Sequence, residues 1–124
     1  MREMAFWFEP RVRDVATAET RFRRILADDD PVPLADFERQ VQEFVGRVRE
    51  RAPQAEIVEN GHADGEPLYS RSGIVIRFPQ ELTKQVYRKI GSAAVQLGLQ
   101  TYDRHRGTVF GGSGPDPDIS ARSS

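Results

Sequence analysis

Few residues of this chain have the types and the spacing that chemistry requires. The only two histidines are His62 and His105. His62 lies close in sequence to Asp64 and Glu66, a loop cluster that could ligate a metal ion or shuttle protons. A metal site needs further ligands, and no spacing in the chain supplies them, so we expect an exposed loop histidine and no metal. His105 lies between two arginines, at the basic tip of a turn.

The remaining candidate motifs favour structural roles. Asp28, Asp29 and Asp30 are consecutive acids. A calcium loop needs ligands at alternating positions, a central glycine and a late glutamate, and this segment has none of these, so it is expected to cap a helix and turn the chain. The glycines of residues 111–114 precede no helix and cannot cradle a phosphate. No serine sits in a strand-to-helix elbow. We therefore predict a protein without catalytic residues or a cofactor.

Composition limits the classes of partner. The 124 residues suit one domain with its own core, and the formal net charge is 18 minus 19, or −1. Nucleic-acid-binding domains usually have a clear basic surplus, so we do not expect nucleic acid as the main partner. Arginine supplies 16 of the 18 basic residues, which fits either bidentate anion binding or a GC-rich coding bias.

The N-terminal residues and the absence of cysteine bear on location. Without cysteine the chain has neither disulfides nor cysteine-ligated metals. The first apolar run is too short for a signal peptide or a membrane span, so we expect a cytoplasmic protein that does not enter a membrane.

Residues 73–103 read as a strand, a helix and a strand. Apolar residues alternate over residues 74–78, and Pro79 ends that strand. From Leu82 the apolar residues recur at helical spacing until Gly98, which is placed to close a helix. Residues 99–102 then begin a second strand.

The rest of the chain supplies the other elements. Residues 3–9 predict a strand that is apolar on both faces, Asp14 can cap a helix, and a second helix runs from Leu34 to Pro53. Residues 55–59 and 108–110 are strand candidates. Residues 60–72 are polar and rich in turn signals, and within them Leu68 and Tyr69 could form a short strand or an anchored loop. We predict one α+β domain over residues 1–110 and a disordered tail over residues 111–124. The expected fold is a ferredoxin-like sandwich, with three helices on one face of an antiparallel sheet of four or five strands.

One-sided helix packing would leave the other sheet face open. Trp7 and Glu9 would point to that face, with Arg77 and Tyr102 from neighbouring strands. Aromatic residues and arginine on an uncovered face are typical of an interface hot spot, so this face is expected to contact another chain, either a partner or a second copy in a homodimer. An RNA-recognition module has aromatics on this face, but residues 71–78 supply aliphatic residues at the signature positions.

Two short segments add a resemblance. Met4-Ala5-Phe6-Trp7 resembles the opening strand of small uncharacterised bacterial proteins found among the immunity proteins of polymorphic toxin systems. The segment of residues 97–103, Leu-Gly-Leu-Gln-Thr-Tyr-Asp, is similar to their closing strand, although Arg104 and His105 stand where that pattern has Pro-Gln. The resemblance implies a cytosolic, non-enzymatic protein that binds and blocks a cognate toxin.

These arguments lead to three functional hypotheses. The first is a protein-binding module that acts as an immunity-type inhibitor. The second is a ligand-binding or enzymatic ferredoxin-like dimer, with Glu9, Arg77 and Asp103 as the polar groups of a cleft. The third is a nucleic-acid-binding domain. The predicted partner-binding residues are Trp7, Glu9, Asp28, Asp29, Asp30, Tyr69, Arg77, Tyr102 and Asp103.

Overall fold

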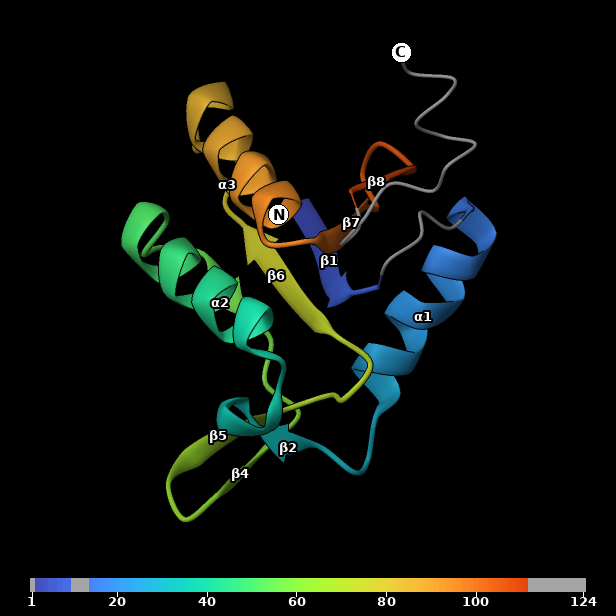
Figure 1. Ribbon diagram of the computed structural model, residues 1–124, viewed down its shortest axis with the longest axis vertical. Coiled ribbons are helices and arrows are strands. Elements are labelled where there is room, and N and C mark those ends of the chain that lie inside the picture. The colour runs from blue at the N-terminus through green and yellow to red at the C-terminus, as the bar shows by residue number, and fades with distance from the viewer. Residues whose placement is uncertain (1, 10–13, 112–124) are drawn as a thin grey trace.

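The computed structural model describes residues 2–9 and 14–111. Its main sheet has five antiparallel strands in the order β3-β6-β1-β7-β8 (Figure 1). The strands are β1 (Arg2–Phe8), β3 (Glu56–Ile57), β6 (Ile74–Phe78), β7 (Leu99–Asp103) and β8 (Thr108–Gly111). All five lie where the sequence predicts strands. Gly111 belongs to β8 and not to the predicted tail, whose other residues lie outside the described part of the chain.

The turn-rich segment of residues 60–72 contains part of a second sheet, and of the two alternatives for Leu68 and Tyr69 the strand is the one observed. The three strands of this sheet are β2 (Val32–Pro33), β5 (Glu66–Tyr69) and β4 (Gly61–Ala63), in that order. Asp64 and Gly65 join β4 to β5 with φ values of 53° and 81°. Two successive left-handed residues form the tight hairpin turn that Asp-Gly favours, so these turn signals mark a hairpin.

Three α-helices form as the apolar spacing predicts: α1 (Val15–Ala27), α2 (Arg39–Arg51) and α3 (Lys84–Gln96). The Asp14 carboxylate caps α1 by accepting a hydrogen bond from the Thr17 amide, and the Thr83 hydroxyl accepts one from the Val86 amide at α3. The predicted second helix is split, because a short 3-10 turn, η1 (Leu34–Asp36), precedes α2.

The helices cover both faces of the main sheet, which corrects the prediction that all three lie on one face. Figure 1 shows α2 and α3 on one side of the sheet and α1 on the other. Met4 and Phe6 pack with α2 and α3, whereas Ala5 and Trp7 pack with α1. Because β1 is apolar on both faces, each face needs a cover, and the apolar stripe of α1 provides the second one.

Candidate functional site

The face around Trp7 belongs to the core. The exposed fractions of Trp7 and Tyr102 are 1% and 3%, because α1 lies over both. The indole Nε1 of Trp7 donates a hydrogen bond to Glu9 (2.7 Å), and the Arg21 guanidinium lies 5.0 Å from the indole ring centroid. The prediction of an open, partner-binding face at Trp7 and Tyr102 is therefore wrong, although these residues do share a face.

Tyr102 also has a satisfied polar group. Its hydroxyl donates to the Glu19 carboxylate (2.8 Å), which Arg104 approaches at 3.1 Å. Burial, and then the hydrogen bond to Glu19, raise the pKa of Tyr102 to about 12. Burial also acts to raise the pKa of Glu19, but hydrogen bonds from Tyr102 and Arg23 outweigh it, so this pKa lies below its usual value. These hydrogen bonds and the ion pair connect α1 to the sheet.

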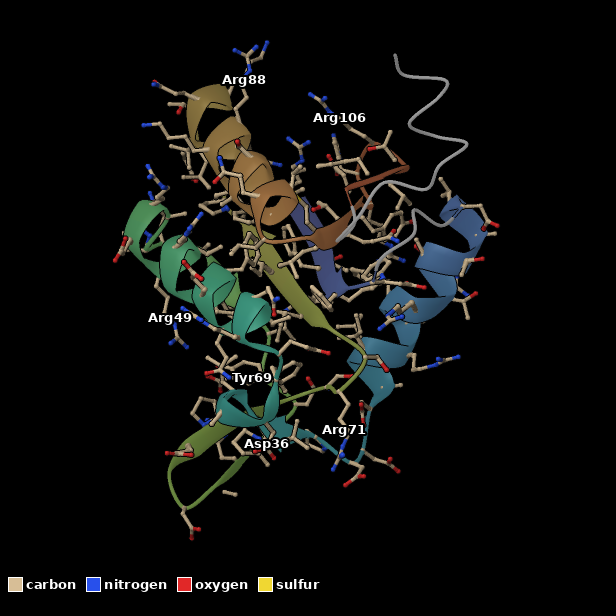
Figure 2. The ribbon with its side chains drawn as sticks, viewed as in Figure 1. Asp36, Arg49, Tyr69, Arg71, Arg88 and Arg106 are labelled. Atoms are coloured by element: carbon tan, nitrogen blue, oxygen red, sulfur yellow. The ribbon has the colours of Figure 1, made fainter. Side chains whose placement is uncertain are left out.

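Four predicted residues lie at the end of the molecule with the small sheet, where Figure 2 labels Asp36, Tyr69 and Arg71. Asp28 turns the chain, since its carboxylate accepts hydrogen bonds from the Ser70 hydroxyl (2.6 Å) and the Asp30 amide (2.8 Å). The Ser70 hydroxyl is the main reason that the pKa of Asp28 is lowered. Tyr69 is buried, which contradicts its prediction as a contact residue. The exposed members of this group are Asp29 and Asp30.

The remaining predicted residues do not meet in one cleft. Arg77 is half-buried and pairs with Glu3 (3.1 Å) and Glu56 (3.6 Å). Glu9 is occupied by the Trp7 indole. Asp103 is buried and lines a different cavity. The expected grouping of Glu9, Arg77 and Asp103 around one ligand is therefore wrong.

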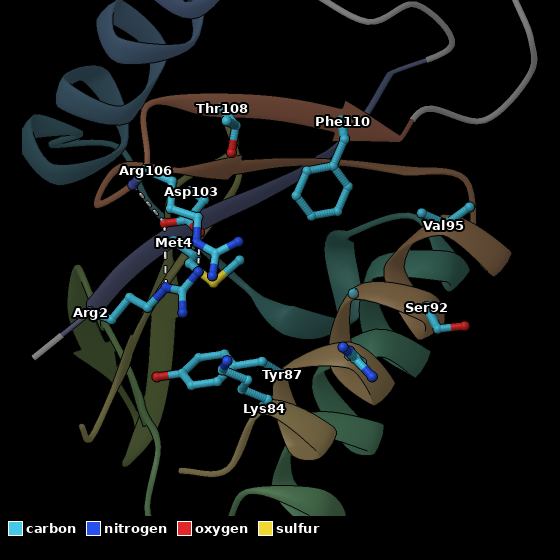
Figure 3. A pocket seen from close by; sticks show the side chains of 12 residues that line it. Arg2, Met4, Lys84, Tyr87, Ser92, Val95, Asp103, Arg106, Thr108 and Phe110 are labelled. Carbon is cyan, nitrogen blue, oxygen red and sulfur yellow. Dashed lines mark hydrogen bonds and ion pairs between the residues drawn. The ribbon is translucent and has the colours of Figure 1, made fainter. Parts of the chain in front are cut away.

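That cavity is an open cleft of about 690 Å³ between α3 and the β7–β8 hairpin (Figure 3). One wall is the face of α3 that carries Lys84, Arg88 and Val95. The opposite wall comes from β7, β8 and the turn between them. Arg2 and Met4 of β1 complete it. The cleft forms because β8 extends the sheet past the helices that cover it.

One end of the cleft is cationic. Arg2 pairs with the buried Asp103 carboxylate, and its guanidinium lies 4.5 Å from the ring centroid of Tyr87. The hydrogen bond to Asp103 raises the pKa of Arg2. The Arg106 amide also donates to Asp103 (3.3 Å), so Asp103 is already engaged on two sides. Lys84 and Arg88 add two further cations from α3.

Three of these cations gather in one cleft without an acidic partner. Among the described residues, Lys84, Arg88 and Arg106 take part in no ion pair. Lys84 begins α3 and Arg88 follows four residues later, while the first turn of that helix has no acidic residue. Like charges four residues apart repel, and cations near a helix N-terminus oppose the helix dipole. The helix carries these charges at a cost in stability.

The other end of the cleft is apolar. Val95 and Phe110 have exposed fractions of 49% and 37%, and both line the cleft. Gly91 lies between them on the α3 wall, where an added Cβ would be 3.8 Å from the Phe110 ring. The absence of a side chain at this position lets the Phe110 ring approach the α3 backbone. The cleft therefore has a charged end and an apolar end.

Comparison with known proteins adds no family or fold assignment. No protein-family model matches the chain, and no curated protein and no solved structure matches it.

Two searches of the described residues also gave negative results. Among residues 2–9 and 14–111, no group of three or more His, Asp or Glu side chains could hold a metal ion. No helix in these ranges is long and apolar enough to cross a membrane. His62 pairs with Glu59 (2.9 Å) on the exposed small sheet.

Sequence reasoning missed the cleft, although part of its signal was present. The basic tip around His105 was recognised, and Arg106 belongs to it. Lys84 and Arg88 are spaced to share one helix face. That this helix face lies opposite the tip depends on β7 and β8 pairing, which spacing alone does not show.

Proposed function

We propose that this protein is a non-enzymatic protein-binding module whose working surface is the cationic cleft beside α3. The observation that carries the proposal is the set of three cations without acidic partners, next to the exposed side chains of Val95 and Phe110. Buried apolar anchors supply most of the affinity of an interface, and complementary charges set partner choice and association rate. An acidic partner surface with an apolar anchor fits this arrangement.

The proposed partner is a cognate bacterial toxin, which the protein would bind and block in the cytoplasm as an immunity-type inhibitor. This part of the proposal comes from the resemblance carried by residues 4–7 and 97–103. The second of these segments ends at Asp103, which holds Arg2 at the charged end of the cleft. A charged surface also explains how such an inhibitor could choose one toxin among several.

The test is co-expression with the product of the adjacent upstream gene, followed by size-exclusion chromatography and a toxicity assay. We expect a stable complex in which the toxic activity is silenced. The variant Arg88→Glu/Arg106→Glu should lose the complex, because it reverses two cations of the cleft. Arg39→Glu is the matched control, since Arg39 is an exposed helical arginine away from the cleft. If the product of the upstream gene is not toxic and elutes separately, the proposal is wrong.

The molecular mass of the protein in solution, measured without a partner, tests for a homodimer.

A small-molecule site is a second candidate, and it is favoured by the size of the cleft. Small-molecule sites typically have volumes of ~300–1,000 Å³ and combine apolar walls with a few polar groups. The cleft volume of about 690 Å³ lies in that range. The open sheet face that this hypothesis first used is covered by α1, so the cleft takes its place.

We further propose that the main sheet is built on a ferredoxin-like core. β1 and β3 run parallel with β6 between them, and β6 and β7 run parallel with β1 between them. Helices α2 and α3 lie on the two crossovers and pack on the same face. This is the split βαβ arrangement. In this view α1, β8 and the small sheet are additions, and two of them, α1 and β8, decide which surface is free.

A further inference from the structure

We infer that the cleft beside α3 binds a small organic anion that has a carboxylate head and an apolar body. This inference rests on the second candidate function, the small-molecule site, and names the chemical class of its ligand; it requires no protein partner. The same chemistry could be presented by a free acid or by an acidic side chain of a partner. The experiment below includes a probe for each source.

The cationic end of the cleft would bind the carboxylate head of the ligand. Formal charges of the side chains there are four positive, from Arg2, Lys84, Arg88 and Arg106, and one negative, from Asp103, which leaves +3. Asp103 and the Tyr87 ring fix Arg2 in place, so it is preorganised. Lys84 and Arg106 come from opposite walls of the cleft (Figure 3). An anion between the walls would gain charge-assisted hydrogen bonds that no described carboxylate now supplies.

The unfavourable position of Lys84 and Arg88 on α3 supports a binding role. Lys84 stands in the first turn, where the helix dipole disfavours positive charge, and Arg88 lies four residues later, where the two like charges repel. Residues that lower the stability of their own helix are expected mainly at functional sites, where binding or catalysis determines the residue type. A bound anion would relieve the repulsion between these cations.

The apolar end of the cleft would bind the apolar body of the ligand. Phe110 and Val95 expose apolar surface on the two walls, and Gly91 lets the Phe110 ring lie close to α3. Ser92 lies near Val95 at this end, whereas Thr108 pairs with Asp103 in the β7–β8 register and lies at the charged end (Figure 3). An apolar group at the apolar end would remove the two exposed side chains from water, and a flat aromatic ring could stack on Phe110.

The geometry sets the length of the ligand. Arg88 and Val95 are seven residues apart on one helix, a separation of about 10 Å at 1.5 Å per residue. A carboxylate and a phenyl ring joined by three methylene groups span a comparable length. We therefore choose 4-phenylbutyrate as the probe.

The experiment is isothermal titration of the full chain with 4-phenylbutyrate, its alcohol 4-phenylbutan-1-ol and its amine 4-phenylbutylamine. The three probes share the apolar body and differ in the charge of the head. We expect saturable binding of the acid, about tenfold weaker binding of the alcohol and none of the amine. Equal binding of acid and alcohol would overturn the inference, as would no saturable binding of the acid in the millimolar range.

Variants locate the site. Arg88→Gln/Arg106→Gln should weaken binding of the acid by about tenfold or more, whereas the control Arg39→Gln should not change it. Gly91→Leu should disrupt the apolar end, because its Cβ would already contact the Phe110 ring and the rest of the side chain would displace that ring or enter the cleft. Thermal melts check that each variant is folded. Binding of the acid that none of the cleft variants changes would overturn the inference.

A second titration distinguishes a free acid from an acidic side chain of a partner protein as the source of the carboxylate. The probe is a blocked peptide with two aspartates followed by a phenylalanine. Tighter binding of the peptide than of the acid, with the same dependence on Arg88 and Arg106, assigns the anion to a protein segment. Tighter binding of the acid assigns it to a free molecule. If the toxin complex forms but neither probe binds, this inference fails while the proposed function stands.

Discussion

The face of the sheet beneath α1 and the cleft beside α3 both combine aromatic residues with arginine, yet they differ in how their polar groups are satisfied. Beneath α1, Trp7 donates to Glu9 and Tyr102 donates to Glu19. In the cleft, Lys84 and Arg88 take part in no ion pair with a described residue. Residue types alone therefore do not identify a binding surface. The distinguishing property is whether the charged groups are already paired within the fold.

From this difference we propose that the first region serves stability and the second serves binding. A side chain whose apolar surface is buried and whose polar atoms are bonded contributes to the free energy of folding. A cation that lowers helix stability and has no partner is retained for another reason. The predictions below test each assignment, starting with the largest expected effect.

The first prediction concerns Trp7. Replacing it with alanine would remove the largest fully buried side chain, so we expect a loss of about 3–5 kcal/mol in the free energy of unfolding, measured by urea denaturation. Phe110→Ala is the comparison variant, because Phe110 is 37% exposed and should cost much less. A Trp7→Ala variant with unchanged stability and weakened partner binding would show that the partner-binding surface is the sheet face beneath α1. Trp7 is the only tryptophan, so iodide should quench its fluorescence poorly.

The second prediction concerns the contact between Tyr102 and Glu19. Tyr102→Phe removes the hydroxyl that donates to the Glu19 carboxylate, and we expect a loss of about 1 kcal/mol at neutral pH. Binding through the cleft should not change. A variant as stable as the original protein would show that α1 is held by its apolar stripe alone.

The pH dependence sharpens this second prediction. Because the pKa of Tyr102 is raised from 10.0 to about 12 in the fold, the neutral phenol stabilises the native state fully below pH 10. That contribution should fade between pH 10 and pH 12, as the phenol ionises. Urea denaturation across this range should show a smaller decline for Tyr102→Phe than for the original protein. Parallel curves would contradict the raised pKa.

The third prediction has the smallest expected effect on stability and the opposite sign. Lys84→Glu places a carboxylate in the first turn of α3, four residues before Arg88, where both the helix dipole and ion pairing favour it. We expect a gain of about 0.5 kcal/mol in the free energy of unfolding. The same variant should bind 4-phenylbutyrate more weakly. Lys84→Gln, which only removes charge, should lie between the two, and a loss of stability in Lys84→Glu would show that Lys84 has a structural role.

Much of the fold could be predicted from local pattern. The alternation over residues 74–78 and the helical spacing after Leu82 fixed the central elements, because each pattern reports on one strand or helix. The same local evidence showed that β1 is apolar on both faces. It did not show that α1 crosses to the second face, since the choice of face depends on how the whole chain packs.

The candidate site was less predictable for a similar reason. Trp7 was correctly placed on the face opposite to Met4 and Phe6, but its burial depends on α1, a separate element. The cleft combines Arg2, Lys84 and Arg106 from three distant parts of the sequence. No spacing rule relates such residues. The arginine-rich composition was compatible with anion binding, but composition does not locate a binding site in the fold.

The most direct test of the account is the ¹H–¹⁵N correlation spectrum of the protein during addition of 4-phenylbutyrate. The amide signals of residues 84–95 and 103–110 border the cleft, and the indole N–H of Trp7 reports on the face beneath α1. We predict that cleft signals shift in a saturable way while the Trp7 indole signal stays in place. A shift of the Trp7 indole with unchanged cleft signals would contradict the account.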